Sequence, residues 1–162
     1  MRRHRNAVYR LVRGHVGDPD EALDLTQECF ATAYRALAQF EVDRSLRGWL
    51  ARIAINKCRD WSRRRMVRRF FAFAAPLSES IAETIEDPAP GPHRDVAGRE
   101  EARRLWAAIA TLSPTMKEPL LLSAMEGLSH AEVAAVLSIS EKAVESRLYR
   151  ARKKLAALLD DG

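Results

Sequence analysis

The chain has 162 residues, of which 47% are apolar, and it carries a net charge of +5. This length suits one compact domain or two small ones, and the apolar content is that of a folded, soluble protein. The longest apolar stretches, such as residues 70–77, fall well short of the roughly 20 residues that a membrane span needs, so we expect a cytoplasmic protein without one.

The charge is unevenly distributed along the chain. Residues 1–75 carry 16 basic and 8 acidic side chains, for a net charge of +8, whereas residues 76–98 carry one and five, for −4; residues 99–162 carry ten and nine, for +1. The acidic segment contains three prolines within five positions and no helical period, so we predict a linker over 77–98. The first module is basic and the second has a basic end, and basic faces on both sides of an acidic linker suggest a polyanion that is held at two places.

No period of two, which would indicate strands, occurs on either side of the linker. We therefore predict an all-α protein with two small helical bundles, over residues 1–76 and 99–162. The first bundle begins with a helix over about 2–16 that Gly17 ends. A second helix starts with Asp18 as its cap and Pro19 in its first position, and runs to about Phe40. Its predicted core positions are Ala22, Leu25, Cys29, Ala33, Leu37 and Phe40.

An acidic and polar patch lies on the opposite side of this second helix. Asp24, Gln27 and Glu28 stand at positions i, i+3 and i+4, which places them together on one face. On helical geometry alone, a solvated surface is the favoured interpretation of such a patch.

Ser45 is expected to cap a third helix, over 45–65, with its core stripe at Leu46, Leu50, Ala54, Cys58 and Trp61. A second stripe steps through the same helix by three and four residues: Trp49, Arg52, Asn56, Arg59 and Arg63. An aromatic ring, an amide and three guanidinium groups provide base stacking, hydrogen bonds to base edges and phosphate contacts. Single-strand binding and a buried Trp49 beside a solvated arginine face remain equal alternatives at this point.

The second bundle contains a helix-turn-helix pattern. Ser129 and Glu132 have the spacing of a capping box, and a turn over 138–140 separates the inward-facing Val133, Ala134 and Leu137 from Val144 and Leu148. Ser140 caps the second helix, which ends with Arg150, Arg152, Lys153 and Lys154 as candidate phosphate contacts, while its first turns reach base edges. An ordinary helical hairpin is the alternative, but it leaves the basic end unexplained.

Three segments together carry a family resemblance: DLTQECFATAYRALAQF at 24–40, RSLRGWLARIAINKCRDWSRRR at 44–65, and LSPTMKEPLLLSAMEGLSHAEVAAVLSISEKAVESRLYRARKKL at 112–155. In this order they resemble bacterial RNA polymerase sigma factors of the extracytoplasmic-function (ECF) group, which keep regions 2 and 4 of the sigma-70 family. The resemblance covers nearly the whole chain. It implies a transcription initiation factor that binds the polymerase core and directs it to promoter DNA.

The resemblance also implies roles for individual residues. Asp24, Gln27 and Glu28 match the patch that docks on the polymerase, which reverses the interpretation of that face as merely solvated. The loop over 41–47 resembles one that pockets a flipped base, and the linker resembles a segment that threads through polymerase channels. The residues implied for the minus-10 element are Trp49, Arg52, Asn56, Arg59 and Arg63, and those implied for the minus-35 element are Lys142, Glu145, Ser146, Arg147, Tyr149, Arg150 and Lys153.

Among the positions that depart from the family pattern, two lie in the turn and in the helix after it. Ser138 stands where the turn often has glycine, and Glu145 stands where lysine or arginine is common. Glu145 has two interpretations: it pairs with a neighbouring cation such as Lys142 or Arg150, or it accepts a hydrogen bond from cytosine in the minus-35 element.

An anti-sigma factor is a further partner that the resemblance implies. The strip FFAFAA at 70–75 could belong to the surface that such a protein covers, or its Phe70, Phe71 and Phe73 could pack on their own bundle.

Two other functional classes are alternatives. A conventional helix-turn-helix regulator, acting on an operator without the polymerase, leaves the Trp49 to Arg63 stripe unused. An enzyme is disfavoured, because His4, His15, His93 and His130 form no ligand or base spacing and no glycine-rich phosphate loop is present. We expect no cofactor and no metal.

Overall fold

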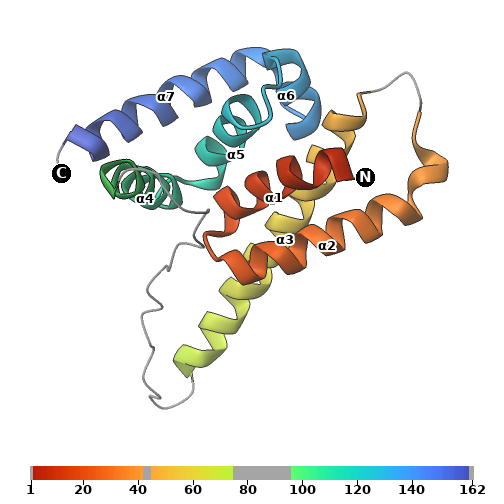
Figure 1. The fold of residues 1–162 in the computed structure, drawn as a ribbon, viewed down its shortest axis with the longest axis horizontal. Coiled ribbons are helices and arrows are strands. Elements are labelled where there is room, and N and C mark those ends of the chain that lie inside the picture. The colour runs from red at the N-terminus through yellow and green to blue at the C-terminus, as the bar shows by residue number, and fades with distance from the viewer. Residues whose placement is uncertain (1, 42–44, 75–95, 161–162) are drawn as a thin grey trace.

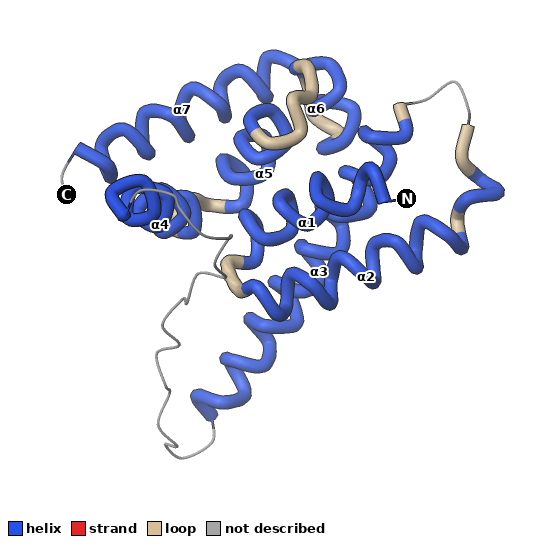
Figure 2. The backbone as a smooth tube through the Cα atoms, viewed as in Figure 1, coloured by secondary structure: helices blue, strands red, loops and turns tan. Residues whose placement is uncertain are grey.

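The computed structural model describes residues 2–41, 45–74 and 96–160. This part of the chain contains seven α-helices, one short 3-10 helix and no strand (Figure 1, Figure 2). The elements in chain order are α1 (Arg2–Val16), α2 (Pro19–Arg35), the 3-10 helix η1 (Leu37–Gln39), α3 (Leu46–Ala74), α4 (Val96–Ala110), α5 (Pro114–Ala124), α6 (His130–Leu137) and α7 (Glu141–Asp160). The predicted all-α fold is confirmed.

Helices α1, α2 and α3 form the N-terminal half, in which each helix packs on the other two. As predicted, α1 ends at Gly17, whose φ of +86° is a conformation that glycine favours. Asp18 then caps α2 by accepting a hydrogen bond of 2.9 Å from the backbone N–H of Glu21, and Pro19 lies in the first turn. Fully or almost fully buried side chains of this half are Leu11, Val12, Ala22, Ala54 and Ile55.

The second helix ends earlier than its apolar spacing predicted, at Arg35 instead of near Phe40. The chain turns through η1, and Leu37, an expected core residue, is 49% exposed. The physical reason is a contact that helical periodicity does not encode: Phe40 has extended backbone and its ring centroid lies 5.0 Å from that of Trp49 in α3. Phe40 thus packs across to the next helix, and the predicted core role of Leu37 is wrong.

The third helix is longer than predicted, since it continues past Arg65 to Ala74. Figure 1 shows its far end projecting beyond α1 and α2. Leu50, Ala54 and Cys58 are buried as expected, but Leu46 is 38% exposed in the first turn of the helix. Its predicted core position is wrong, because α2 ends too early to cover it.

Helices α4 to α7 form the C-terminal half, in which α7 packs on α4, α5 and α6. The capping box is confirmed: the Ser129 hydroxyl accepts from the Glu132 backbone N–H at 3.3 Å, and the Glu132 carboxylate accepts from the Ser129 backbone N–H at 2.8 Å. The side chains predicted to face inward are buried, namely Val133, Ala134, Leu137, Val144 and Leu148. The helix-turn-helix thus forms from the residues that predicted it.

The turn between α6 and α7 is closed by two serines. Ser138 ends α6 with φ 57° and ψ 48°, the left-handed region that favours glycine. Ser140 caps α7: its hydroxyl accepts a hydrogen bond of 3.1 Å from the backbone N–H of Ala143. Ile139 between them packs partly buried against the core.

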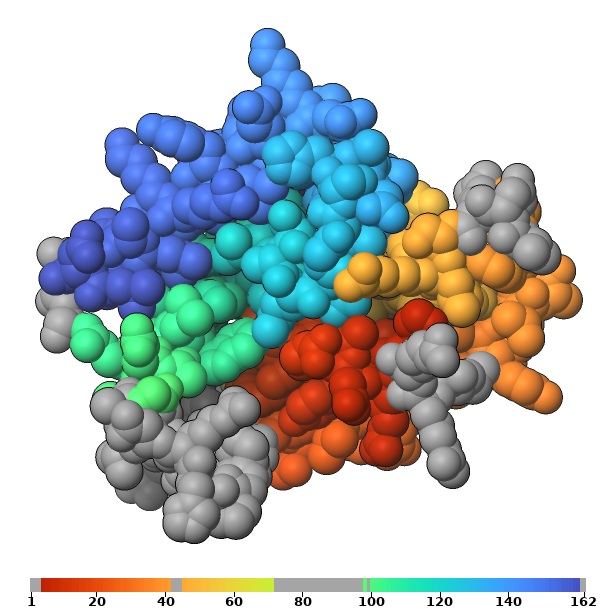
Figure 3. Space-filling model, turned by 45° about the horizontal axis from the view of Figure 1, so that its top comes forward, coloured from red at the N-terminus to blue at the C-terminus, as the bar shows by residue number. Residues whose placement is uncertain are grey.

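The two halves pack directly on each other, which the sequence did not predict. Helix α1 contacts α4 and α5, and α3 contacts α6; Figure 3 shows the C-terminal half seated on α1 and α3. Gly14 permits a close approach, because a Cβ there would lie 2.7 Å from Cδ2 of Leu121 and 3.0 Å from the ring of Trp106. The result is one apolar core shared by both halves.

The predicted linker at 77–98 lies outside the described residues up to position 95, and its last three positions are the start of α4. Among the described helices, none has both the length and the apolar character that crossing a membrane requires.

Candidate nucleic-acid and polymerase interfaces

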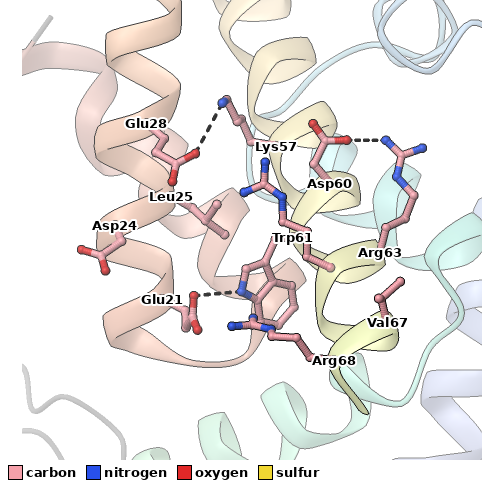
Figure 4. A pocket seen from close by; sticks show the side chains of 11 residues that line it. Glu21, Asp24, Leu25, Glu28, Lys57, Asp60, Trp61, Arg63, Val67 and Arg68 are labelled. Atoms are coloured by element: carbon pink, nitrogen blue, oxygen red, sulfur yellow. Dashed lines mark hydrogen bonds and ion pairs between the residues drawn. The ribbon is translucent and has the colours of Figure 1, made fainter. Parts of the chain in front are cut away.

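Asp24 and Glu28 line a groove between α2 and α3 (Figure 4). Both are exposed on α2, and Glu28 forms an ion pair of 3.4 Å with Lys57 of α3. At the base of the groove the indole N–H of Trp61 donates to the carboxylate of Glu21 at 2.8 Å. The wall on α3 is mostly basic, with Lys57, Arg63, Arg64 and Arg68, and it also carries one carboxylate, Asp60, which pairs with Arg63. A partner segment that enters this groove therefore meets only carboxylates as charged groups on the α2 side and mainly cationic groups on the α3 side.

Gln27, the third predicted docking residue, turns to the other side of α2. It lines a separate hollow with Arg5, Asn6 and Tyr9 of α1. The structure therefore brings Asp24 and Glu28 together in one groove, while exposed Gln27 stands on the same helix beside a second hollow.

Trp49 and Asn56 of the predicted strand-binding stripe remain accessible. Trp49 is half-buried against Phe40 and also lines a hollow between α3 and α6 with Gly48 and Val136. Asn56 is exposed. The predicted base-pocketing loop over 41–47 includes residues 42–44, which lie outside the described residues.

Two arginines of the stripe are held by the C-terminal half. Arg52 donates a hydrogen bond of 2.8 Å from Nη2 to the hydroxyl of Ser138. Arg59 binds Glu118 with two hydrogen bonds, of 2.8 Å to Oε1 and 2.6 Å to Oε2, and these bonds raise the pKa of Arg59 above its ordinary value. Arg63, farther along α3, forms an ion pair with Asp60 and is 73% exposed. The stripe follows one helix face, but some of its residues bind the C-terminal half and others do not.

Glu118 of α5 is a functional candidate that sequence reasoning missed. Its side chain is almost fully buried, and Nε2 of the equally buried His15 lies 3.5 Å from its Oε1. Burial alone raises the pKa of a carboxyl group, but Arg59 and His15 outweigh it, so the pKa of Glu118 lies below its ordinary value of 4.5. A charge inside the apolar run KEPLLLS was the available signal, since a buried carboxylate requires a cationic partner.

A second buried carboxylate lies near the other end of the same interface. Glu126 is 3% exposed, and its Oε2 lies 3.8 Å from Nε of Arg47. Its other oxygen, Oε1, has no hydrogen-bond partner. The C-terminal half thus presents two acidic groups and one hydroxyl to a row of arginines on α3.

Helix α7 presents the predicted duplex-reading residues to the outside. Its buried stripe is Val144, Leu148, Ala151 and Leu155, which fixes the opposite face toward solvent. Arg147 is half-buried, and the remaining predicted residues are exposed: Lys142, Glu145, Ser146, Tyr149, Arg150 and Lys153.

Glu145 forms no ion pair with Lys142 or Arg150 in the described part of the chain, so the pairing interpretation is not supported by this conformation. Arg150 instead donates to the backbone carbonyl of Ser146 at 3.3 Å.

The aromatic residues at the end of α3 do not pack on their own bundle. Phe70 is 74% exposed and Phe71 is 67% exposed, and the two rings contact each other edge to face with centroids 5.9 Å apart. The interpretation that they are buried is therefore wrong for these two residues. The reason is that α3 extends past the ends of the helices that could cover it. The side chain of Phe73 is outside the described part of the structure.

No group of three or more metal-ligating side chains occurs within the described ranges. The two cysteines, Cys29 and Cys58, are buried between α2 and α3, and burial raises the pKa of both thiols, to about 12 for Cys29. Both behave as small apolar core residues.

Each half of the chain matches a known family model. Residues 1–68 match the family model for sigma-70 region 2, and residues 102–155 match that for sigma-70 region 4. The chain is 40% identical over 159 residues to RNA polymerase sigma factor CnrH of Cupriavidus metallidurans, which covers 98% of this chain and 83% of CnrH. It is 32% identical over 155 residues to ECF RNA polymerase sigma factor SigE of Mycolicibacterium smegmatis, covering 96% of this chain and 58% of SigE.

Solved structures give the same result for the whole fold. CnrH in complex with the cytosolic domain of CnrY superposes with a TM-score of 0.71 at 34% identity, over 98% of this chain and 84% of that chain. The sigma factor RpoE in complex with the anti-sigma factor NepR from Bartonella quintana superposes with a TM-score of 0.78 at 25% identity, over 96% and 91%. Both superpositions include the two halves together.

Proposed function

The chain belongs to the ECF group of the sigma-70 family of RNA polymerase sigma factors, and we propose which of its surfaces perform each step of promoter recognition. As a sigma factor it binds the polymerase core and directs it to promoters, opening the minus-10 element and reading the minus-35 element. The observation that carries this conclusion is the ordered match to regions 2 and 4 across both halves. A helix-turn-helix regulator that acts without the polymerase is not favoured, because it accounts only for the second match.

Docking on the polymerase is assigned to the groove between α2 and α3. Asp24 and Glu28 form its acidic wall, and Gln27 extends the docking surface along α2. Support comes from the charge of this half, whose net charge is strongly positive while this one face is acidic. A basic helical element of the polymerase complements that face.

Capture of the opened minus-10 strand is assigned to α3. Trp49 stacks on a base, Asn56 binds a base edge, and Arg52, Arg59 and Arg63 bind the strand backbone. Reading of the minus-35 duplex is assigned to the exposed face of α7. Base edges there are contacted by Glu145, Ser146, Arg147 and Tyr149. Phosphates are contacted by Lys142, Arg150 and Lys153.

The predicted modules, residues 1–76 and 99–162 with a linker over 77–98, are part of this proposal. We also assign an anti-sigma factor as a partner, since RpoE is held by one, NepR, in the solved complex. The exposed Phe70 and Phe71 belong to the surface that this partner covers. The protein acts in the cytoplasm, where the polymerase is, and it catalyses no reaction itself.

The docking assignment is tested with a charge reversal. Asp24→Lys combined with Glu28→Lys should weaken binding to the polymerase core at least about tenfold, because like charges would face each other across the dock. The matched control is Glu101→Lys with Asp160→Lys, two exposed acids of the C-terminal half that raise the net charge equally. Binding is measured by co-elution with core and by run-off transcription. Equal binding by the two double variants contradicts the assigned dock.

A further inference from the structure

The far end of α3, over residues 64–74, lies outside the core of the N-terminal half. Figure 1 shows it projecting beyond α1 and α2, and every side chain over 64–71 is exposed. Four of these side chains are apolar, since Met66 and Val67, at 68% and 52% exposed, precede Phe70 and Phe71. A group of exposed apolar side chains on one helix marks a surface that a partner covers.

This end of the helix has two opposite faces. At 100° per residue, the four apolar side chains fall within an arc of about 140°. Over 64–71 the opposite arc, again about 140° wide, is occupied by four arginines: Arg64, Arg65, Arg68 and Arg69. Arg63, one residue earlier, lies toward the apolar side, but it pairs with Asp60. The end of α3 is therefore a basic amphipathic helix.

We propose that this end of α3 is a reversible binding site for an anionic lipid membrane. The helix lies in the plane of the surface, with its apolar face at the boundary between headgroups and acyl chains. Basic amphipathic helices bind membranes in this way, because the burial of apolar area and the attraction to anionic headgroups act together. The site is only about three turns long, so the attachment is peripheral and reversible.

Two arginines at the borders of the apolar face are placed to bind lipid phosphates. Arg64 borders it beside Phe71, and Arg69 borders it on the side of Met66. Neither arginine forms an ion pair with another described residue. Arginine can lay its apolar stem along a surface while its guanidinium group stays at the level of the headgroups. The two borders thus bring positive charge to the phosphates while the rings between them are inserted.

The combination of the two faces favours lipid over other partners. A nucleic-acid backbone binds arginines, but it offers no apolar surface to the four exposed apolar side chains. A groove in a protein partner accounts for the apolar face of an amphipathic helix and leaves the arginines without a role. An anionic membrane accounts for the apolar face and for the arginines at both of its borders.

Lipid binding has a consequence for the other proposed partners. Arg64, Val67 and Arg68 also line the groove to which polymerase docking is assigned, so a chain that lies on a membrane does not present this wall to the polymerase. The proposed anti-sigma partner covers Phe70 and Phe71, which excludes the membrane as well. The sigma factor that neither partner holds therefore has a membrane-bound fraction. This consequence rests on the proposed function, whereas the lipid site itself does not.

Binding of the full chain to lipid vesicles tests the proposal. Vesicles of phosphatidylglycerol mixed with phosphatidylcholine are compared with vesicles of phosphatidylcholine alone, by sedimentation. We expect binding to the anionic vesicles to be at least about tenfold tighter, because the arginines are attracted to the anionic surface. The polymerase is absent from this experiment, so its outcome is independent of the proposed dock.

Two double variants test the two faces separately. Phe70→Ser with Phe71→Ser removes the inserted rings, and Arg64→Gln with Arg69→Gln removes the border charges. Each should weaken binding to the anionic vesicles at least about tenfold. The matched controls alter exposed residues elsewhere and should leave this affinity almost unchanged: Leu37→Ser with Leu158→Ser for the rings, and Arg10→Gln with Arg104→Gln for the charges.

Insertion is measured with Phe70→Trp, which keeps an aromatic ring at an exposed position. Lipids with brominated acyl chains should quench its fluorescence more strongly than that of the wild-type chain. Two results overturn the proposal. If the wild-type chain does not bind anionic vesicles, the exposed rings belong to a protein partner alone. If Phe70→Ser with Phe71→Ser binds them as tightly as the wild type does, the arginines act by charge alone, as on a nucleic-acid backbone.

Discussion

The two proposed DNA-binding faces are presented differently. On α3, Arg52 and Arg59 are engaged by Ser138 and Glu118 of the other half. On α7, Tyr149 and Arg150 are exposed, and within the described residues this face makes no ion pair with the N-terminal half. The difference shows that whether an arginine is free to bind DNA depends on the partners that the rest of the chain gives it. The proposed duplex-reading face of α7 is open, whereas the proposed strand-capturing face of α3 is partly engaged: Arg52 and Arg59 have partners on the other half, while Asn56 and Arg63 stay exposed.

The largest expected effect compares an arginine on each face. Arg59→Ala should lower the free energy of unfolding by about 2 kcal/mol, because it leaves the carboxylate of Glu118 buried without its main partner. Arg150→Ala, on the open face of α7, should change it by no more than about 0.5 kcal/mol. Chemical denaturation of the two variants measures both values. Equal destabilisation would mean that the two faces do not differ in the way the contacts indicate.

The next prediction separates opening of DNA from other defects. Trp49→Ala and Asn56→Ala should each slow formation of the open complex on duplex promoters by roughly tenfold, because a base loses its stacking or hydrogen-bonding partner. On a template with a pre-melted bubble both variants should initiate almost normally. Asn56 is exposed, so its variant leaves the core intact. An equal loss on both templates would point to folding or docking, with Trp49 serving only to pack on Phe40.

A smaller effect concerns the open face. Glu145 is exposed and forms no ion pair with Lys142 or Arg150 in the described part of the chain, so its carboxylate is available to accept a hydrogen bond from cytosine N4. Glu145→Lys should change discrimination at one base pair of the minus-35 element by about 1 kcal/mol, moving the preference from cytosine toward guanine. Selection from a randomised minus-35 library measures this preference. Unchanged preference at every position would leave Glu145 without a role in reading the sequence.

The smallest effect is on the pH dependence of the free energy of unfolding, through the contact between Arg59 and Glu118. The pKa of Glu118 lies below its ordinary value of 4.5, owing to Arg59 of α3 and His15 of α1, so its contribution to stability is fully present above pH 4.5. That contribution is lost as the pH falls below 4.5 through the lowered pKa of the folded state. Unfolding measured across this range should therefore show a steeper loss for the wild-type chain than for Glu118→Gln. Parallel curves would contradict the role given to this carboxylate.

The sequence predicted those parts of the fold that depend on residues close together in the chain. Asp18, Ser45, Ser129 and Ser140 each accept the capping hydrogen bond expected of them, since a cap involves residues within three positions. The inward face of the helix-turn-helix followed from the spacing of apolar residues for the same reason.

Contacts between distant segments were not predicted. Phe40 lies beyond the end of α2 and packs on Trp49 of α3. The end of α3 extends past the neighbouring helices. Both features depend on the position of another helix. Arg59 and Glu118 are 59 positions apart, and helical periodicity carries no information on such a pair. The stripe on α3 was identified by residue type, but only the tertiary structure shows that two of its arginines, Arg52 and Arg59, bind the other half.

The central claim is that the groove between α2 and α3 is the dock for the polymerase core, with Asp24 and Glu28 as its acidic residues. The most direct measurement is the binding of core polymerase by Asp24→Lys combined with Glu28→Lys, compared with Glu101→Lys combined with Asp160→Lys, which raises the net charge equally. Core binding that falls at least about tenfold in the first double variant and stays unchanged in the second is the predicted result. Equal core binding by the two double variants would contradict the claim.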